Sequence, residues 1–153
     1  MYFSKLFPKS IESLKQSKIK LENGLKVFGI ESDEVPLVQF NLIIDGGQLV
    51  ERMDKLGVAN LTADLLEKGT KNKTVSELED ALAQLGASGS ISAGKESIMV
   101  SGTTLAKNYN ATIALVKEML LEPRWDSEEF ELLKSETVSS IMQQQGNPNR
   151  VAQ

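Results

Sequence analysis

The first regular pattern along the chain is a pair of short segments on either side of an Asn-Gly dipeptide. Residues 18–21 alternate polar and apolar side chains, Asn23 and Gly24 follow, and residues 25–30 are again rich in apolar side chains. Asn-Gly between two such segments is a strong signal for a β-hairpin, because its turn needs positive φ at both central positions. The apolar run 37–44 comes next and predicts a buried strand.

Two segments with helical spacing follow this strand. Apolar residues recur with a helical period across 57–67, and Gly69 comes soon after the last of them. Residues 74–77 (Thr-Val-Ser-Glu) form a capping box, in which the threonine hydroxyl and the glutamate carboxylate each satisfy a backbone N–H. The second helix is expected to end at Gly86, because glycine readily adopts the left-handed conformation that closes a helix.

A second hairpin and two more helices complete the pattern. Residues 88–93 and 96–103 are predicted strands joined by a Gly-Lys turn. One helix is expected over 106–121, and another is expected from a cap at Ser127 up to Gly146. The predicted apolar faces of these two helices consist of Tyr109, Ile113, Val116 and Leu120, and of Phe130, Leu133, Thr137 and Ile141.

The order of these elements predicts the fold class. A hairpin and a strand, two helices, a hairpin and two helices indicate an α+β domain with an antiparallel sheet and helices packed on one face. The chain has 153 residues, which is enough for one domain and too few for two. Residues 1–18 mix Lys, Ser and isolated apolar residues and are predicted to form a polar lead-in, so the domain itself is expected to cover 19–153.

The composition excludes several classes of function. The formal net charge is −4 and the 17 Lys and Arg residues are scattered, which argues against nucleic-acid binding because the phosphate backbone needs a basic face. No apolar run is long enough to span a bilayer. The chain has no Cys and no His. Acting alone it therefore cannot form a thiolate zinc site or a Ser-His-Asp triad, and it cannot use histidine for acid–base catalysis.

One segment has the frame of a metal-site motif without the metal ligands. Residues 57–70 have the sequence Gly-Val-Ala-Asn-Leu-Thr-Ala-Asp-Leu-Leu-Glu-Lys-Gly-Thr. This segment resembles the zinc-site helix of the M16 family (insulinase, pitrilysin and mitochondrial processing peptidase), whose pattern is Gly-x-Ala-His-x-x-Glu-His followed by Gly-Thr. There, two His four residues apart hold one zinc ion and the Glu activates the metal-bound water. The resemblance places Asn60 and Asp64 at the His positions and Ala63 at the Glu position.

The remaining zinc ligand of the family is also absent from the position that the resemblance assigns to it. In the family, a further Glu comes from a later helix, and counting along this chain from Asp64 leads to Ser140. All four chemical positions, Asn60, Ala63, Asp64 and Ser140, are therefore degenerate. The resemblance implies the catalytically inactive half or partner subunit of a bacterial M16 member, with no zinc in this chain. It also implies that Asn60, Asp64 and Ser140 lie near one another.

The resemblance extends over nearly the whole chain from Ile19. It implies the M16 metallopeptidase-like fold, also described as LuxS/MPP-like, in a half-domain that is incomplete at its C-terminus. Such a half would pair, as in a heterodimer, with a zinc-bearing homologous M16 half or subunit and enclose peptide substrate, and it would neither bind nucleic acid nor insert into a membrane. The chain would be periplasmic as part of a larger exported peptidase, and cytoplasmic otherwise.

Two features of the predicted helix and strand each have two interpretations. Asn60 and Asp64 can share a hard cation such as Ca²⁺ through oxygen ligands, or they form the polar face of an amphipathic helix. We favour the polar face, because two oxygen donors are too few for a Ca²⁺ site. The Gly46-Gly47 pair is either an anion-binding nest or a turn after the strand, and we favour the turn.

The segment Ser90, Ile91 and Ser92 also has two interpretations. In the active half of the M16 family the corresponding strand pairs with extended substrate by strand addition, so these residues are candidate substrate-binding positions. The alternative is an ordinary edge strand that stays polar to limit aggregation. Two other functions remain open for the whole chain. It can be a scaffold or binding module of the same fold with no proteolytic role, or, least favoured, an independent enzyme that uses carboxylates alone.

Overall fold

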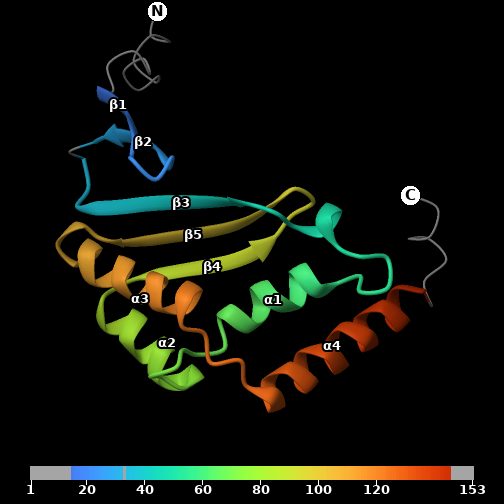
Figure 1. Ribbon diagram of the computed structural model, residues 1–153. Helices are drawn as coiled ribbons and strands as arrows, with labels where there is room; N and C mark the ends of the chain where they lie inside the picture. Colours follow the sequence, from blue (N-terminus) through green and yellow to red (C-terminus); the bar gives the residue numbers. More distant parts are fainter. Residues whose placement is uncertain (1–14, 33, 146–153) are drawn as a thin grey trace, which may run out of the picture. The chain divides into compact units, whose positions relative to one another are not determined.

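The computed structural model describes residues 15–32 and 34–145 (Figure 1). The described residues divide into two compact units, with the boundary between Pro36 and Leu37. The elements in chain order are β1 (Lys15–Lys20), β2 (Lys26–Glu31), β3 (Leu37–Asp45), the 3₁₀ turn η2 (Gln48–Val50), α1 (Val58–Leu66), α2 (Val75–Gln84), β4 (Ser88–Ala93), β5 (Ser97–Leu105), the 3₁₀ turn η3 (Ala106–Asn108), α3 (Tyr109–Leu121) and α4 (Ser127–Gln145).

The smaller unit contains the predicted first hairpin. Strands β1 and β2 pair antiparallel, with Lys20 opposite Lys26 at the turn end. Gly24 has φ 89°, and the Asn23 side-chain oxygen accepts a hydrogen bond from the Leu25 N–H at 3.1 Å, so the Asn-Gly signal produces the turn that it predicts. Strand β1 begins at Lys15, earlier than expected. Most of the predicted lead-in lies outside the described residues, and its boundary at residue 18 stays a prediction.

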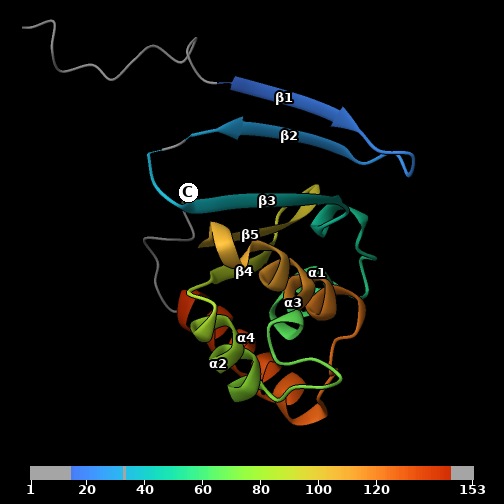
Figure 2. The ribbon, with the colours of Figure 1, turned by 90° about the vertical axis from the view of Figure 1, so that its left-hand side faces the viewer.

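The larger unit is a three-stranded antiparallel sheet with helices on one face. The strand order is β3-β5-β4, and α1, α2 and α3 lie on one side of this sheet (Figure 2). The capping box at Thr74 and Glu77 begins α2 as predicted. A core of apolar side chains fills the space between the layers and consists of Ala63, Leu66, Leu78, Ile91, Val100 and Met119.

Strand β3 is not buried, and this prediction was wrong. Its side chains alternate between exposed and partly buried positions, and Ile43 is 60% exposed. The apolar run suggested a strand covered on both faces. In the larger unit the helices cover one face only, so every second side chain of β3 points away from the core.

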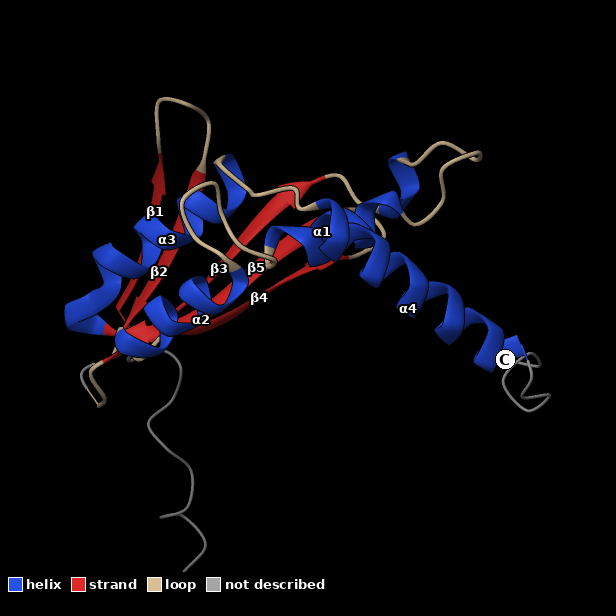
Figure 3. Cartoon of the chain, turned by 90° about the horizontal axis from the view of Figure 1, so that it is seen from below, coloured by secondary structure: helices blue, strands red, loops and turns tan. Residues whose placement is uncertain are grey.

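The two C-terminal helices also differ from their predicted faces. In α3 the buried side chains are Thr112 and Met119, whereas Tyr109 is exposed. In α4 the N-cap is Asp126 rather than Ser127, because the Asp126 carboxylate accepts hydrogen bonds from the backbone N–H groups of residues 128 and 129. Ile141 is 50% exposed, because α4 runs outward from α1 past the sheet (Figure 3). The predicted end at Gly146 lies outside the described residues.

The Gly46-Gly47 pair forms a turn after β3, as favoured, and the N–H groups of Gly46 and Gln48 are bonded to backbone carbonyls. The Gly46 N–H donates to the Glu96 carbonyl at 3.0 Å, and the Gln48 N–H donates to the Gly94 carbonyl at 3.0 Å. Gly47 has φ 95°, and a Cβ on it would lie 2.5 Å from the Gly94 oxygen. Only glycine therefore lets this turn fold against the tip of the β4–β5 hairpin.

One carboxylate joins the loop between α1 and α2 to helix α3. Glu118 accepts hydrogen bonds from the Thr70 hydroxyl at 2.7 Å, the Asn72 amide at 3.1 Å and the Lys73 ammonium at 2.9 Å. The Glu118 side chain is 17% exposed. The hydrogen bond from Lys73, followed by that from Thr70, holds the pKa of Glu118 below its ordinary value of 4.5.

We predict that Glu118→Gln lowers the free energy of unfolding at neutral pH by about 1–2 kcal/mol, because the Gln side chain loses the charged bond to Lys73. A lowered pKa in the folded state adds stability that is present above the ordinary pKa and lost as pH falls through the folded value. The difference between wild type and variant should therefore shrink in acid. Urea unfolding followed by circular dichroism at several pH values measures it. Glu131→Gln, which removes an exposed pair with Lys134, is the control and should change little.

Candidate functional site

Helix α1 carries three of the four degenerate positions, and they fall on two different faces. Asn60 and Asp64 are exposed, one turn apart on the same face. Ala63 is completely buried and belongs to the core. The Asn60 side-chain oxygen accepts a hydrogen bond from the Gln48 amide at 3.4 Å. The outward face of α1 thus has an amide and a carboxylate at the positions that the resemblance assigns to metal-binding imidazoles.

The fourth degenerate position, Ser140, lies on α4. The side chain of Ser140 is exposed, and α4 packs against α1 (Figure 1). The predicted proximity of Asn60, Asp64 and Ser140 requires α1 and α4 to be in contact, and these helices are in contact. The correspondence of the four positions to a former zinc site nevertheless stays a prediction.

The described residues offer no ready set of metal ligands. Across 15–32 and 34–145, no group of three or more His, Cys, Asp or Glu side chains converges as a possible metal site. Asn60 and Asp64 contribute two oxygen donors, and a Ca²⁺ ion needs six to eight. This arrangement supports the interpretation of Asn60 and Asp64 as the polar face of α1.

The start of α1 is held by a carboxylate from the preceding loop. Glu51 accepts a hydrogen bond from the Gly57 N–H at 2.9 Å and another from the Ala59 N–H at 2.6 Å. Backbone N–H groups at a helix start have no partner within the helix, and a negative charge there interacts favourably with the helix dipole. Sequence inspection missed this cap, because Glu51 is six residues before Gly57 and no local capping pattern includes it.

The candidate substrate-binding residues lie on β4, one of the two edge strands of the larger unit's sheet. The side chain of Ile91 is buried in the core, whereas Ser90 and Ser92 are exposed on the opposite face. Ile91 is therefore a core residue, and any pairing with an added strand would involve its backbone and not its side chain. Its backbone N–H is already engaged, since it donates a hydrogen bond to the Glu67 carboxylate.

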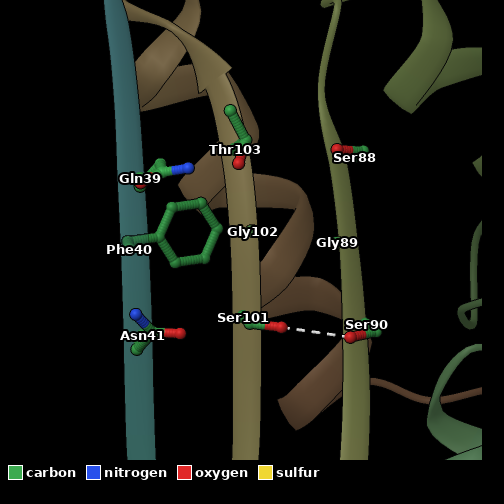
Figure 4. Close-up of a pocket in the computed structure, with 9 residues that line it drawn as sticks. All are labelled: Gln39, Phe40, Asn41, Ser88, Gly89, Ser90, Ser101, Gly102 and Thr103. Atoms are coloured by element: carbon green, nitrogen blue, oxygen red, sulfur yellow. Dashed lines mark hydrogen bonds between the residues drawn. The ribbon is translucent and has the colours of Figure 1, made fainter.

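A polar hollow lies on the face of the sheet that the helices leave uncovered. Ser90 and Ser101 alternate with core residues of their strands, so their hydroxyls point to this face, where they share a hydrogen bond of 3.0 Å (Figure 4). The hollow has a volume of about 360 Å³ and its lining contains no charged side chain, so it offers no carboxylate or ammonium group for acid–base catalysis. Its lining residues are Gln39, Phe40, Asn41, Ser88, Gly89, Ser90, Ser101, Gly102 and Thr103.

Comparison with known proteins identifies the family. Residues 27–153 match the family described as insulinase (peptidase family M16). The chain belongs to the M16 family. The predicted resemblance is therefore confirmed at the level of the family.

Two relatives of this M16 chain are similar in sequence. The mitochondrial-processing peptidase subunit alpha-1 of Dictyostelium discoideum is 28% identical over 110 residues, which cover 72% of this chain and 17% of that protein. The non-peptidase homolog YmxG of Helicobacter pylori is 23% identical over 117 residues, which cover 76% of this chain and 27% of that protein. This chain thus spans less than a third of the length of either relative.

Solved structures confirm the predicted α+β M16 fold. A peptidase M16 inactive domain from Pseudomonas fluorescens superimposes with a TM-score of 0.84 at 24% identity, covering 91% of this chain and 34% of that chain. A protease from Helicobacter pylori superimposes with a TM-score of 0.73 at 21% identity, covering 90% of this chain and 33% of that chain.

Within the described residues, none of the helices has the length and apolar character needed to cross a bilayer.

We predict that Glu51→Ala lowers the free energy of unfolding by about 0.5–2 kcal/mol, because two N–H groups at the start of α1 lose their acceptor. Glu51→Gln retains one side-chain oxygen and should cost less. Urea unfolding measures the loss, and hydrogen exchange of the Gly57 and Ala59 amides localises it. Asp54→Ala removes an exposed ion pair in the same loop and should leave both measurements nearly unchanged.

Proposed function

We propose that this M16 chain is a non-catalytic domain that completes a peptidase by pairing with a zinc-bearing homologous half. The paired halves would enclose unfolded peptide, and zinc and the water-activating Glu would belong to the partner. The observation that carries the proposal is on α1. The scaffold around the motif is present, from the Gly57 start to the buried Thr70, but its outward positions are an amide and a lone carboxylate.

This arrangement supports a structural role because catalysis in the motif depends on side chains that the chain lacks. Zinc-assisted hydrolysis needs protein ligands that hold the ion and a base that takes a proton from its bound water. Ala63 is a methyl group in the core, so it can supply no base. The relatives include proteins described as an inactive domain and as a non-peptidase homolog, and their descriptions agree with the proposal.

The correspondence of Asn60, Asp64 and Ser140 to a zinc site predicts that metal binding can be installed. The triple variant Asn60→His, Asp64→His and Ser140→Glu should bind one Zn²⁺ per chain, because two imidazoles one turn apart and a carboxylate from α4 would share one ion. Ala63 is left unchanged, since a Glu at this fully buried position would threaten folding. Zinc titration with a competing chelator measures the affinity.

The matched control moves the His pair to another helix. Glu79 and Ala83 are exposed and four residues apart on α2, so Glu79→His and Ala83→His with Ser140→Glu keep the same substitutions without the proposed geometry. The α1 variant should bind Zn²⁺ at least about tenfold more tightly than this control, since it has one more ligand in reach. Equal affinities would show that Ser140 does not face Asn60 and Asp64.

The pairing itself predicts a gain of activity in a partner. An M16 subunit from the same genome that retains His-x-x-Glu-His should hydrolyse a quenched unfolded peptide faster when this chain is added, because the second half closes the chamber around the peptide. Hydrolysis rate against chain concentration measures the effect, and a Glu→Gln change in the partner's motif is the control. A stable complex whose rate does not change would favour the alternative, a scaffold module without a proteolytic role.

A further inference from the structure

Strand β4 has one edge paired with β5 and one edge facing outward. Within the described part of the chain no strand pairs with this outer edge. Gly94 donates a backbone hydrogen bond to Ser97 at the tip of the hairpin, so hydrogen-bonded and non-hydrogen-bonded pairs alternate from there along β4. Ile91, opposite Val100, therefore turns its N–H and carbonyl to the outer edge, as do Gly89 and Ala93.

The middle of this outer edge is occupied by a side chain of α1. The Ile91 N–H donates a hydrogen bond to the carboxylate of Glu67, and α1 packs along β4. In a sheet, that N–H would bond the backbone carbonyl of an added strand. The Glu67 oxygen takes the position of that carbonyl.

The contact between Glu67 and Ile91 joins the C-terminal end of α1 to the edge of β4. Glu67 is the C-cap of α1, and its own N–H bonds the carbonyls of Asp64 and Leu65. A negative charge at the C-terminal end of a helix is destabilising, because it meets the negative end of the helix dipole. The hydrogen bond to Ile91 offsets this cost, and it holds the end of α1 against the strand.

We infer that Glu67 closes the outer edge of β4 to strand addition, and that the edge opens to an extended peptide whose basic side chain draws the carboxylate away from Ile91. Strand addition needs the Ile91 N–H, which lies between the outward groups of Gly89 and Ala93. A Lys or Arg of the peptide would pair with Glu67, so the carboxylate would exchange one partner for another and leave the N–H to the peptide backbone. This inference goes beyond pairing with a zinc-bearing half and does not depend on it.

Two substitutions separate the hydrogen bond from the charge. Glu67→Ala removes both, whereas Glu67→Gln keeps an acceptor oxygen for the Ile91 N–H and removes only the charge. Amide hydrogen exchange should show the Ile91 N–H exchanging about tenfold faster in Glu67→Ala than in wild type, since a bond from an amide to a charged group is lost. In Glu67→Gln, Ile91 should stay largely protected. Glu79→Ala, an exposed acid on α2, is the matched control and should match wild type.

The binding test uses two labelled extended peptides that differ at one central residue, Ac-Thr-Ser-Thr-Lys-Thr-Ser-Thr-NH₂ and the same peptide with norleucine in place of Lys. Fluorescence anisotropy should show wild type binding the Lys peptide more tightly than the norleucine peptide. Glu67→Ala should bind both equally, because the edge is open and the charge is gone. Glu67→Gln should bind neither well, because the edge stays closed without a charge to attract Lys.

Three results would overturn the inference, provided that circular dichroism shows each variant folded. One is unchanged exchange at Ile91 in Glu67→Ala. Another is that wild type and Glu67→Ala bind the norleucine peptide with the same affinity, or that neither of them binds it. A third is dimerisation of Glu67→Ala in sedimentation without peptide binding, which would assign the opened edge to a second copy of the chain. None of these results bears on hydrolysis by a zinc-bearing partner, so failure here leaves the proposed function to its own tests.

Discussion

Burial of apolar side chains between one face of the β3-β5-β4 sheet and helices α1, α2 and α3 is the constraint on which the larger unit depends. Each helix contributes at least one core side chain, and the sheet contributes Ile91 and Val100. Complete burial of a side chain the size of Leu stabilises a fold by about 1.5–3 kcal/mol. None of these core residues needs a metal ion to take its place. The packing of this core therefore depends on apolar contacts and not on the identity of the exposed residues Asn60 and Asp64.

The two carboxylates at the ends of α1 explain how this helix keeps its position. Glu51 bonds the first N–H groups of α1, where a negative charge is favourable, and Glu67 ends the helix on β4, where a negative charge is unfavourable. The Glu51 contact is an ordinary helix cap. The Glu67 contact places a side-chain oxygen where an added strand would place its carbonyl, and so connects the geometry of α1 to the availability of the sheet edge.

Helix α1 separates its exposed polar positions from the position that contributes to the core. Asn60 and Asp64 lie on the outward face of α1, so changing them alters no core contact. Ala63 lies on the inward face and is completely buried. A methyl group there adds to the packing, whereas a carboxylate in that environment would need a partner. In the predicted correspondence to the zinc motif, the catalytic-base position therefore lies in the core of this domain, and the two ligand positions on α1 lie on its surface.

The amino-acid sequence by itself determined the elements whose signals are local. The Asn-Gly turn, the capping box at Thr74 and the period of apolar residues in α1 and α2 each depend on neighbours within a few positions, so hairpins, helices and their order could be predicted. The α+β class and the M16 resemblance followed from that order and from the frame of residues 57–70.

Only the tertiary structure decided which faces are covered and which polar groups meet. The exposure of β3 and α4 depends on where the helices lie on the sheet, and periodicity cannot report that. The bonds from Glu51 to the start of α1, from Glu118 to the α1–α2 loop and from Glu67 to Ile91 join residues 6 to 48 positions apart. Such contacts form because packing of the core brings distant segments together, and no local pattern of side chains encodes them.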